Sequence, residues 1–220
     1  MKLTDSLAEQ AILENLIEET KPPIPADCAQ LHFLLMTPFR YSLSNPWGSR
    51  FRRAHAPDGV FYAAEHAETA IAEMSFHRLL FFAESPKTPW PQNPGEYTAF
   101  AAEFSSDRAI DISAEPFRGD LGLLDPIDYS ASQAFADVAR GAAIVIIKYP
   151  SVRDPEKRAN LAILKPAAFS HPEPVDRQSW RIHLDANGAR ALCEMPSRSI
   201  AFGRDTFSAD SRIAAIAWDR

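Results

Sequence analysis

Five side chains that could act together in chemistry lie close in the sequence, in the order Arg40, Arg50, Tyr62, Glu73 and His77. Guanidinium groups bind phosphate oxygens through paired hydrogen bonds, and a carboxylate stabilises positive charge that develops in a transition state. An imidazole four residues after the glutamate is placed for proton transfer or for a simple helix-stabilising contact. The set therefore favours an anionic substrate on which positive charge develops, such as a nucleotide in which a bond is broken.

Standard phosphate-binding and metal-binding signatures are missing from the sequence. Gly119 and Gly122 form neither a dinucleotide fingerprint nor a phosphate-binding loop. His66, Glu73 and His77 share one face of a predicted helix, but no ligand from a second segment accompanies them. We therefore expect no metal site.

Ser151 adds a hydroxyl group from a distant segment. It follows Pro150 and the apolar run 143–147, which is the clearest buried strand in the sequence. A hydroxyl at the end of such a strand can face a ligand, or it can simply close a turn. A serine hydrolase is not supported, because this serine lacks the Gly-x-Ser-x-Gly elbow.

The composition is that of an ordinary globular protein of 220 residues, with 46% hydrophobic and 24% charged residues. A net charge of -6 argues against broad binding to nucleic acid. The two cysteines, Cys28 and Cys193, suit neither a zinc site nor a disulfide framework and fit a reducing compartment. No apolar run resembles a signal region or a bilayer span, so we expect a cytoplasmic protein that does not engage membranes.

Secondary structure must position the reactive side chains. The apolar run 31–36 predicts a buried strand that leads to Arg40, and the run 59–64 predicts a second strand. Apolar residues at helical spacing over 67–82 predict a helix that carries the glutamate and the imidazole on neighbouring turns. The proline-rich stretch 84–95 predicts a surface loop, which could act as a lid.

The remainder of the chain predicts more strands than helices, in one domain. Strands are predicted over 97–104, 108–112, 143–147, 160–164, 180–184, 190–195, 199–202 and 213–218, and a helix over 129–139 with Gly141 at its end. Residues 185–188 have the sequence of a hairpin turn. The expected fold is therefore α+β.

The N-terminal region predicts a short amphipathic helix. Ser6 and Glu9 have the spacing of a capping box, and Pro22 and Pro23 end the pattern. Packing of the apolar face against its own domain is the favoured interpretation, because most such faces belong to a core. Binding to a partner or to a second copy, which would give a homodimer, stays open.

Five short motifs, in order, resemble the RES domain, a family named for an arginine, a glutamate and a serine. They are Thr37-Pro38-Phe39-Arg40-Tyr41, Gly48-Ser49-Arg50-Phe51, Gly59-Val60-Phe61-Tyr62, Thr69-Ala70-Ile71-Ala72-Glu73 and Tyr149-Pro150-Ser151-Val152-Arg153. The resemblance covers about residues 31–169. It divides the chain into an N-terminal helix with a proline-rich connector, residues 1–30, and a RES-like catalytic domain, residues 31–220.

The resemblance implies a compact domain with a split mixed β-sheet flanked by helices, as in ADP-ribosyltransferase toxins. It implies an enzyme that cleaves the nicotinamide-ribosyl bond of NAD and transfers ADP-ribose to water or phosphate, with NAD as substrate and no cofactor. Many members are toxins neutralised by a helix-turn-helix antitoxin of the Xre type. Two alternatives stay open: ADP-ribosylation of a specific protein, and a non-catalytic module that binds a nucleotide or a partner.

The resemblance also implies a role for each matched residue. Arg50 would hold the NAD pyrophosphate or an acceptor phosphate, with Arg40 as a second anion contact. Tyr62 would orient the nicotinamide-ribose portion, and Glu73 would stabilise an oxocarbenium-like transition state, as carboxylates do in glycosidic cleavage. Ser151 would bond the nucleotide near the reacting end, and the imidazole one turn after the glutamate would be a further contact.

Overall fold

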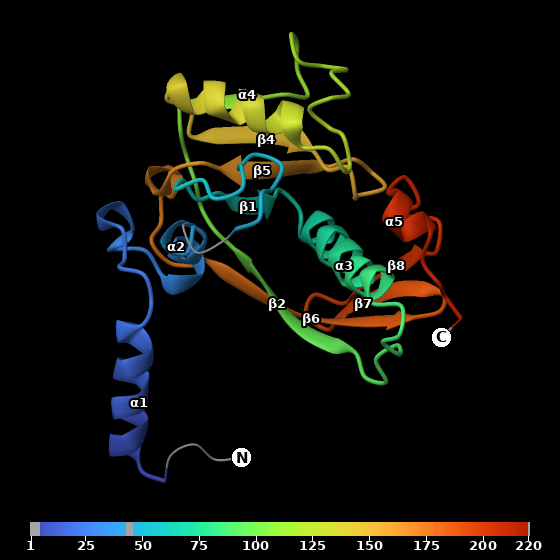
Figure 1. Cartoon of the computed structure of the whole chain (residues 1–220), viewed down its shortest axis with the longest axis horizontal. Coiled ribbons are helices and arrows are strands. Elements are labelled where there is room, and N and C mark those ends of the chain that lie inside the picture. The colour runs from blue at the N-terminus through green and yellow to red at the C-terminus, as the bar shows by residue number, and fades with distance from the viewer. Residues whose placement is uncertain (1–4, 43–45, 220) are drawn as a thin grey trace.

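Two four-stranded β-sheets frame the fold, with strand orders β1-β5-β4-β3 and β2-β6-β7-β8 (Figure 1). The structure is a computed structural model that describes residues 5–42 and 46–219. The first sheet comprises Phe61–Ala64 (β1), Ala159–Ile163 (β5), Ile146–Pro150 (β4) and Ala109–Asp111 (β3). The second comprises Gly95–Ala101 (β2), Asp176–Asp185 (β6), Gly188–Cys193 (β7) and Arg198–Gly203 (β8). The first sheet is mixed, because β3 runs parallel to β4 while the other pairs are antiparallel.

The described part of the chain contains five α-helices. They are Leu7–Glu19 (α1), Phe33–Arg40 (α2), Ala67–Glu84 (α3), Ser130–Gly141 (α4) and Ser211–Ala214 (α5). Short 3₁₀ turns lie at Ala26–Cys28 and Pro166–Ala168. The prediction of an α+β fold in one compact domain with a split, mixed sheet arrangement is confirmed.

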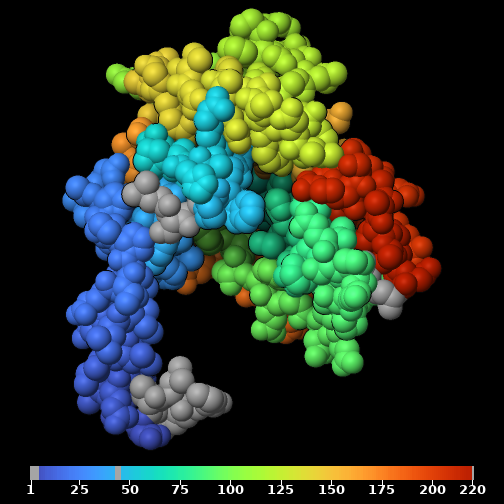
Figure 2. Space-filling model, viewed as in Figure 1, coloured from blue at the N-terminus to red at the C-terminus, as the bar shows by residue number. Residues whose placement is uncertain are grey.

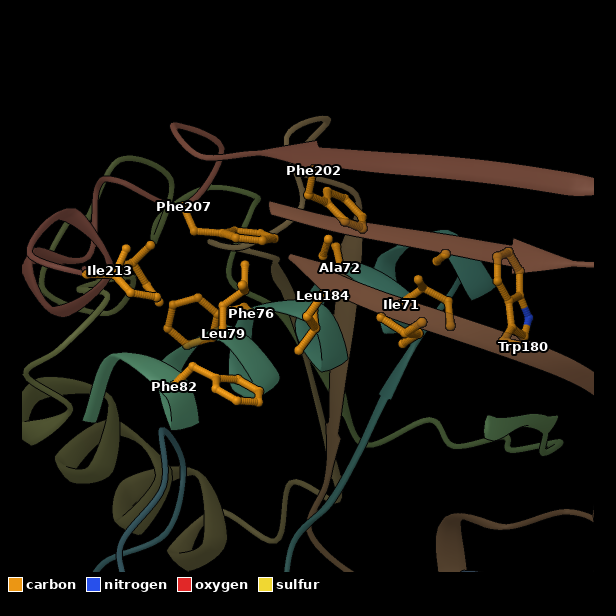
Figure 3. Packing of buried hydrophobic residues seen from close by; sticks show 14 of the residues in the cluster. Ile71, Ala72, Phe76, Leu79, Phe82, Trp180, Leu184, Phe202, Phe207 and Ile213 are labelled. Atoms are coloured by element: carbon orange, nitrogen blue, oxygen red, sulfur yellow. The ribbon is translucent and has the colours of Figure 1, made fainter. Parts of the chain in front are cut away.

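Helix α3 lies between the two sheets and takes part in the largest core (Figure 1). Figure 3 shows Phe76, Leu79 and Phe82 of this helix packed among buried side chains of the second sheet and the C-terminal segment, including Leu184 and Phe207. Burial of such large apolar side chains contributes about 1.5–3 kcal/mol each. The inner face of α3 is therefore fixed by packing, which leaves its other face to present polar groups.

The first sheet is buried on both faces because its residues alternate between them. Ile147 and Ala162 pack in a cluster with residues of α4, whereas Ile146 and Ile163 pack in a cluster with residues of α2. Strands covered on both sides read as continuous apolar runs. This explains why β4 and β5 are easy to find in the sequence.

The predicted strand over 31–36 is wrong, because most of this run belongs to helix α2. The His32 side chain caps the helix by accepting a 3.2 Å hydrogen bond from the backbone N–H of Leu34. Leu35 and Phe39, four residues apart, are buried on one side of it. A short apolar run fits a buried helix and a buried strand equally well, so periodicity alone could not decide.

The predicted strand over 213–218 is also wrong. Helix α5 starts after Asp210, whose carboxylate accepts a 3.0 Å hydrogen bond from the backbone N–H of Arg212. Ile213 and Ile216, three residues apart, are both buried in the core shared with α3. A capping aspartate before apolar residues at this spacing is typical of a helical turn.

The other predicted elements are confirmed, with shifted ends. The strand expected over 143–147 is Ile146–Pro150. It begins later because Ala143, with φ at 58°, has a left-handed backbone and belongs to the turn that follows α4. Gly141 is the last helical residue, so Ala143 and not this glycine makes the reversal. The hairpin between β6 and β7 is present, with Asp185 paired to Gly188.

Helix α1 forms as predicted but does not pack as predicted. Ser6 accepts a 3.1 Å hydrogen bond from the backbone N–H of Glu9, as the capping box requires. None of its residues is buried, and Leu7 and Ile12 are 85% and 60% exposed. Figures 1 and 2 show the helix standing away from the body of the protein. Its apolar side chains point to several sides, so they do not form one face for the core.

None of the helices within residues 5–42 and 46–219 has the length and apolar character needed to cross a bilayer.

Candidate functional site

A cavity of about 510 Å³ opens along the polar face of α3. Its walls come from α3, from β1 and the loop before it, from the start of α4, and from the ends of β4 and β5. The lining residues are Gly48, Ser49, Arg50, Tyr62, Ala63, Ala70, Glu73, Met74, His77, Tyr129, Tyr149, Val152, Arg153 and Asn160. Four predicted site residues, Arg50, Tyr62, Glu73 and His77, are therefore brought together here.

Glu73 points one carboxylate oxygen at two donors from the first sheet. Its Oε1 accepts hydrogen bonds of 2.6 Å from the Ser151 hydroxyl and 2.6 Å from the side-chain amide of Asn160. No described residue donates a hydrogen bond to Oε2. The carboxylate is thus fixed in orientation and keeps one oxygen for a ligand.

Ser151 contacts Glu73 and is not among the lining residues, and the direct contact with the nucleotide that the resemblance implies stays a prediction. Only 1% of the residue is exposed. Its Oγ accepts hydrogen bonds from the backbone N–H groups of Arg153 at 3.1 Å and Asp154 at 3.0 Å, while donating to the glutamate. The serine therefore joins the loop after β4 to helix α3.

Asp154 makes a second connection between this loop and α3. Its carboxylate accepts a 2.6 Å hydrogen bond from the Thr69 hydroxyl, one turn before Glu73, and pairs with Arg158 at 2.6 Å. Burial raises the pKa of Asp154, but the hydrogen bonds from Arg158 and Thr69 outweigh it, so the pKa is lowered. The loop after β4 is held against the helix at two points.

Arg50 is only 7% exposed and reaches the cavity from the loop before β1. Its Nη1 donates a 2.9 Å hydrogen bond to the carbonyl oxygen of Leu123, and its guanidinium lies 4.8 Å from the centre of the Tyr129 ring. No carboxylate forms an ion pair with it among the described residues. A buried guanidinium without a counter-ion favours the binding of an anion.

Tyr62 lines the cavity from β1 and anchors the loop that carries Arg50. Its hydroxyl lies 2.8 Å from the Ser49 hydroxyl and accepts a 3.0 Å hydrogen bond from the backbone N–H of Phe51. Burial raises the pKa of the Tyr62 phenol, against an opposing effect of the Ser49 hydrogen bond. The phenol is therefore neutral at pH 7 and works as a donor, an acceptor and an aromatic surface.

His77 lies one turn after Glu73 on α3 and also lines the cavity. Burial lowers the pKa of the imidazole below 6.5, although the negative charge of Glu73 opposes that shift. At pH 7 the imidazole is neutral. It can accept or donate a hydrogen bond beside the carboxylate without adding charge.

Arg40 is not among the lining residues, and its role as a second anion contact stays a prediction. Its Nη2 lies 2.6 Å from Oε1 of Glu18, and its Nε donates a 2.7 Å hydrogen bond to the carbonyl oxygen of Pro22. Residues 33–40 form a helix and not the predicted strand. Arg40, the last residue of this helix, therefore points toward the end of α1 and the segment that follows it. Arg40 thus holds the N-terminal connector to the domain.

The expected lid over 84–95 contributes no lining residue. Trp90 packs 5.8 Å from Trp218, ring centre to ring centre, and its indole N–H donates a 3.0 Å hydrogen bond to the carbonyl oxygen of Trp218. Its ring also lies 4.9 Å from that of Phe82. The loop is fixed against the C-terminal segment, on the side of α3 that forms the core.

Five polar lining residues were not predicted as site residues: Ser49, Tyr129, Tyr149, Arg153 and Asn160. Tyr149 and Asn160 are paired neighbours on β4 and β5, so the register of these strands brings both to the cavity. Burial raises the pKa of Tyr149 well above 10. Tyr149 and Arg153 flank Ser151 within one motif, and that proximity is the signal that could have identified them.

Comparison with known proteins adds one finding to this geometry. The family model of the RES domain matches residues 24–185, which extends beyond the expected 31–169 on both sides and contains every predicted site residue. A comparison with curated proteins finds no match. RES domains are known as NAD-degrading toxins. With its family model matched over more than half of its length, the chain belongs to the RES domain family.

Proposed function

We propose that this protein cleaves the nicotinamide-ribosyl bond of NAD and transfers ADP-ribose to water or to phosphate. The observation that carries the proposal is the Glu73 carboxylate, held through Oε1 by Ser151 and Asn160 on the wall of the cavity that Arg50 also lines. Membership in a family of NAD-degrading enzymes supports the choice of substrate.

The binding step follows from the charges in the cavity. The diphosphate of NAD would meet the guanidinium of Arg50, which has no carboxylate partner among the described residues. The half-buried ring of Tyr62 would lie against the nicotinamide-ribose portion, since its hydroxyl is held by Ser49 and the backbone of Phe51. In this arrangement the bond to be broken would lie beside Glu73.

The chemical step is cleavage of one carbon–nitrogen bond and formation of one carbon–oxygen bond. Nicotinamide leaves with the electron pair of the bond to C1′, and the ribosyl group becomes oxocarbenium-like. Oε2 of the Glu73 carboxylate stabilises this positive charge, or it aligns the acceptor. An oxygen of water or phosphate then attacks C1′ and releases a proton. Neutral His77 adds no positive charge beside the developing cation.

The biological role we propose is that of a toxin in a toxin-antitoxin pair. Family membership supports an Xre-type helix-turn-helix antitoxin as partner. We propose action in the cytoplasm, where NAD is available, without direct binding to nucleic acid or membranes. The exposed apolar side chains of α1 could bind a partner protein or a second copy of this chain in a homodimer.

The test is incubation of the purified protein with NAD, with and without phosphate, followed by measurement of nicotinamide release. ADP-ribose is expected without phosphate and its 1-phosphate with it, and Glu73→Gln protein is the matched control. Absence of nicotinamide release in both conditions would overturn the proposal. Transfer of labelled ADP-ribose to a protein would replace it with protein modification, and calorimetric NAD binding without product would replace it with a non-catalytic module.

A further inference from the structure

Arg153 is a buried cation on the wall of the cavity, and sequence reasoning gave it no role. It is 6% exposed, and its guanidinium carbon lies 3.8 Å from the centre of the Phe76 ring. Its Nη2 donates a 2.6 Å hydrogen bond to the carbonyl oxygen of Pro126. Nε and Nη1 donate to no described residue. The guanidinium is therefore held from one side and has donors left for a ligand.

The carboxylate that pairs with Arg153 is shared with a second arginine. Asp210 lies 3.5 Å from its Nη2, but the same carboxylate is bound by Arg212 through two bonds of 3.0 and 2.7 Å and also caps α5. Asp125, in the loop beside both cavity arginines, uses its carboxylate to accept from the backbone N–H groups of Ile127 and Asp128. The positive charge of Arg153 is thus only partly balanced.

Arg50 and Arg153 are held in the same manner. Each donates to a backbone carbonyl of one loop, at Leu123 and Pro126, and each packs against an aromatic ring. Both line the cavity, where Glu73 is the one lining carboxylate. Because Asp210 is shared with Arg212, the two cavity guanidinium groups keep an excess of positive charge over Glu73, which an anionic ligand would balance.

We infer that Arg153 binds the diphosphate of the substrate together with Arg50. The inference rests on the proposed function, since the diphosphate in question is that of NAD. Two forked guanidinium groups suit a diphosphate because each can bind oxygens of one phosphoryl group. The ligand class is a nucleoside diphosphate, and Arg153 takes the place for which Arg40 was expected.

Some of the residues that hold Arg153 in position lie outside the part of the chain that matches the family model. The match ends at residue 185, whereas Asp210 lies in the segment that packs α5 against α3. Phe76, which lies under the guanidinium, is itself packed against Phe207 at 5.7 Å. The C-terminal segment therefore helps to set the position of a ligand-binding side chain.

Calorimetry with ADP as the probe tests the inference without requiring turnover. Arg153→Gln should weaken ADP binding about 10- to 100-fold, the loss of a charge-assisted hydrogen-bonding group. Arg153→Lys keeps the positive charge at this position and should weaken ADP binding less than Arg153→Gln does. Arg53→Gln is the matched control, because Arg53 is exposed, pairs with Asp137 and does not line the cavity.

Kinetics with NAD supply a second readout. A diphosphate contact is remote from the broken bond, so Arg153→Lys should raise KM while leaving kcat nearly unchanged. ADP affinity and KM equal to those of the wild type in both variants would overturn the inference and leave the proposed function intact. Binding of ADP that depends on Arg153, in a protein that does not cleave NAD, would support the inference and overturn the proposed function.

Discussion

The Ser151 hydroxyl donates a 2.6 Å hydrogen bond to Oε1 of Glu73, across 78 positions of sequence. The bond joins the loop after β4 to helix α3 and sets the direction of the carboxylate. The same hydroxyl accepts from two backbone N–H groups of its own loop. One side chain therefore shapes the loop and orients the carboxylate, although it is buried out of contact with the cavity.

Replacing Glu73 with glutamine should abolish most of the activity and spare the fold. The amide keeps the size of the side chain and can still accept from Ser151 and Asn160, but it carries no negative charge for an oxocarbenium-like transition state. We expect kcat for nicotinamide release to fall about 10²–10³-fold. An unchanged thermal unfolding midpoint would show that the loss is chemical, and a kcat near that of the wild type would contradict the role of the carboxylate.

Ser151→Ala should lower both stability and kcat. Two buried backbone N–H groups lose their acceptor, which costs about 1–3 kcal/mol in the free energy of unfolding. Glu73 also loses a donor, so we expect kcat to fall about tenfold as the carboxylate gains freedom. Denaturant titration and nicotinamide release measure the two effects.

The matched control is Ser42→Ala. Ser42 is also buried, and its hydroxyl donates to the carbonyl oxygens of Phe39 and Pro57, away from the cavity. This variant should lose a similar amount of stability and keep the kcat of the wild type. Equal losses of kcat in both serine variants would mean that Ser151 acts only through general stability.

The sequence was sufficient for elements in which pattern and packing agree. The sequence predicted helix α3, strands β4 and β5 and the β6–β7 hairpin. Amphipathic spacing, continuous apolar runs and turn residues each indicate a single type of secondary structure in these segments. The run 31–36 is compatible with a strand or a helix, and the His32 side chain stabilises the helix by capping it. For α1, the capping box predicted a helix correctly but said nothing about what covers it.

The candidate site was predicted in part for a related reason. Arg50, Tyr62, Glu73 and His77 lie on consecutive parts of the chain, the loop before β1, β1 and α3, so spacing along the chain reported their proximity. Arg153 depends on contacts with distant segments, through Phe76 and Pro126, which one-dimensional spacing does not report. Arg40 was assigned as an anion contact through the resemblance, and the described contacts of its guanidinium are with Glu18 and Pro22.

Arg40 and Arg50 should respond differently to replacement by glutamine. Arg50→Gln removes a cavity guanidinium and should raise KM for NAD about tenfold or more. Arg40→Gln breaks the contacts with Glu18 and Pro22 and should lower the free energy of unfolding by about 1–3 kcal/mol, with KM unchanged. Steady-state kinetics and denaturant titration of both variants measure this contrast, which an equal rise in KM would disprove.

His77 should make the protein less stable as pH falls below 6.5. Because burial lowers the pKa of the folded imidazole, the unfolded chain takes up a proton between 6.5 and that lower value while the folded chain does not. Because His77 is itself an exposed residue, solvent weakens the effect, and the free energy of unfolding decreases only slightly with decreasing pH in this window.

Denaturant titrations from about pH 7.5 to about pH 5 would measure this effect, and His77→Gln should lose less stability over that range than the wild type. The matched change at the exposed His171 controls for the removal of a histidine. Parallel curves for His77→Gln and the wild type would refute the assignment.

Helix α3 presents Glu73 to the cavity on one face and packs Phe76, Leu79 and Phe82 into the second sheet on the other. Three of the four strands of that sheet, together with α5, lie within residues 176–214 and are translated after α3. During synthesis from the N-terminus, the first half of the chain therefore carries Arg50, Tyr62 and Glu73 without the surface that holds their helix in place. We expect a ribosome-bound or prematurely terminated chain to be inactive, so that cellular NAD is exposed to the enzyme only once a complete copy has been released.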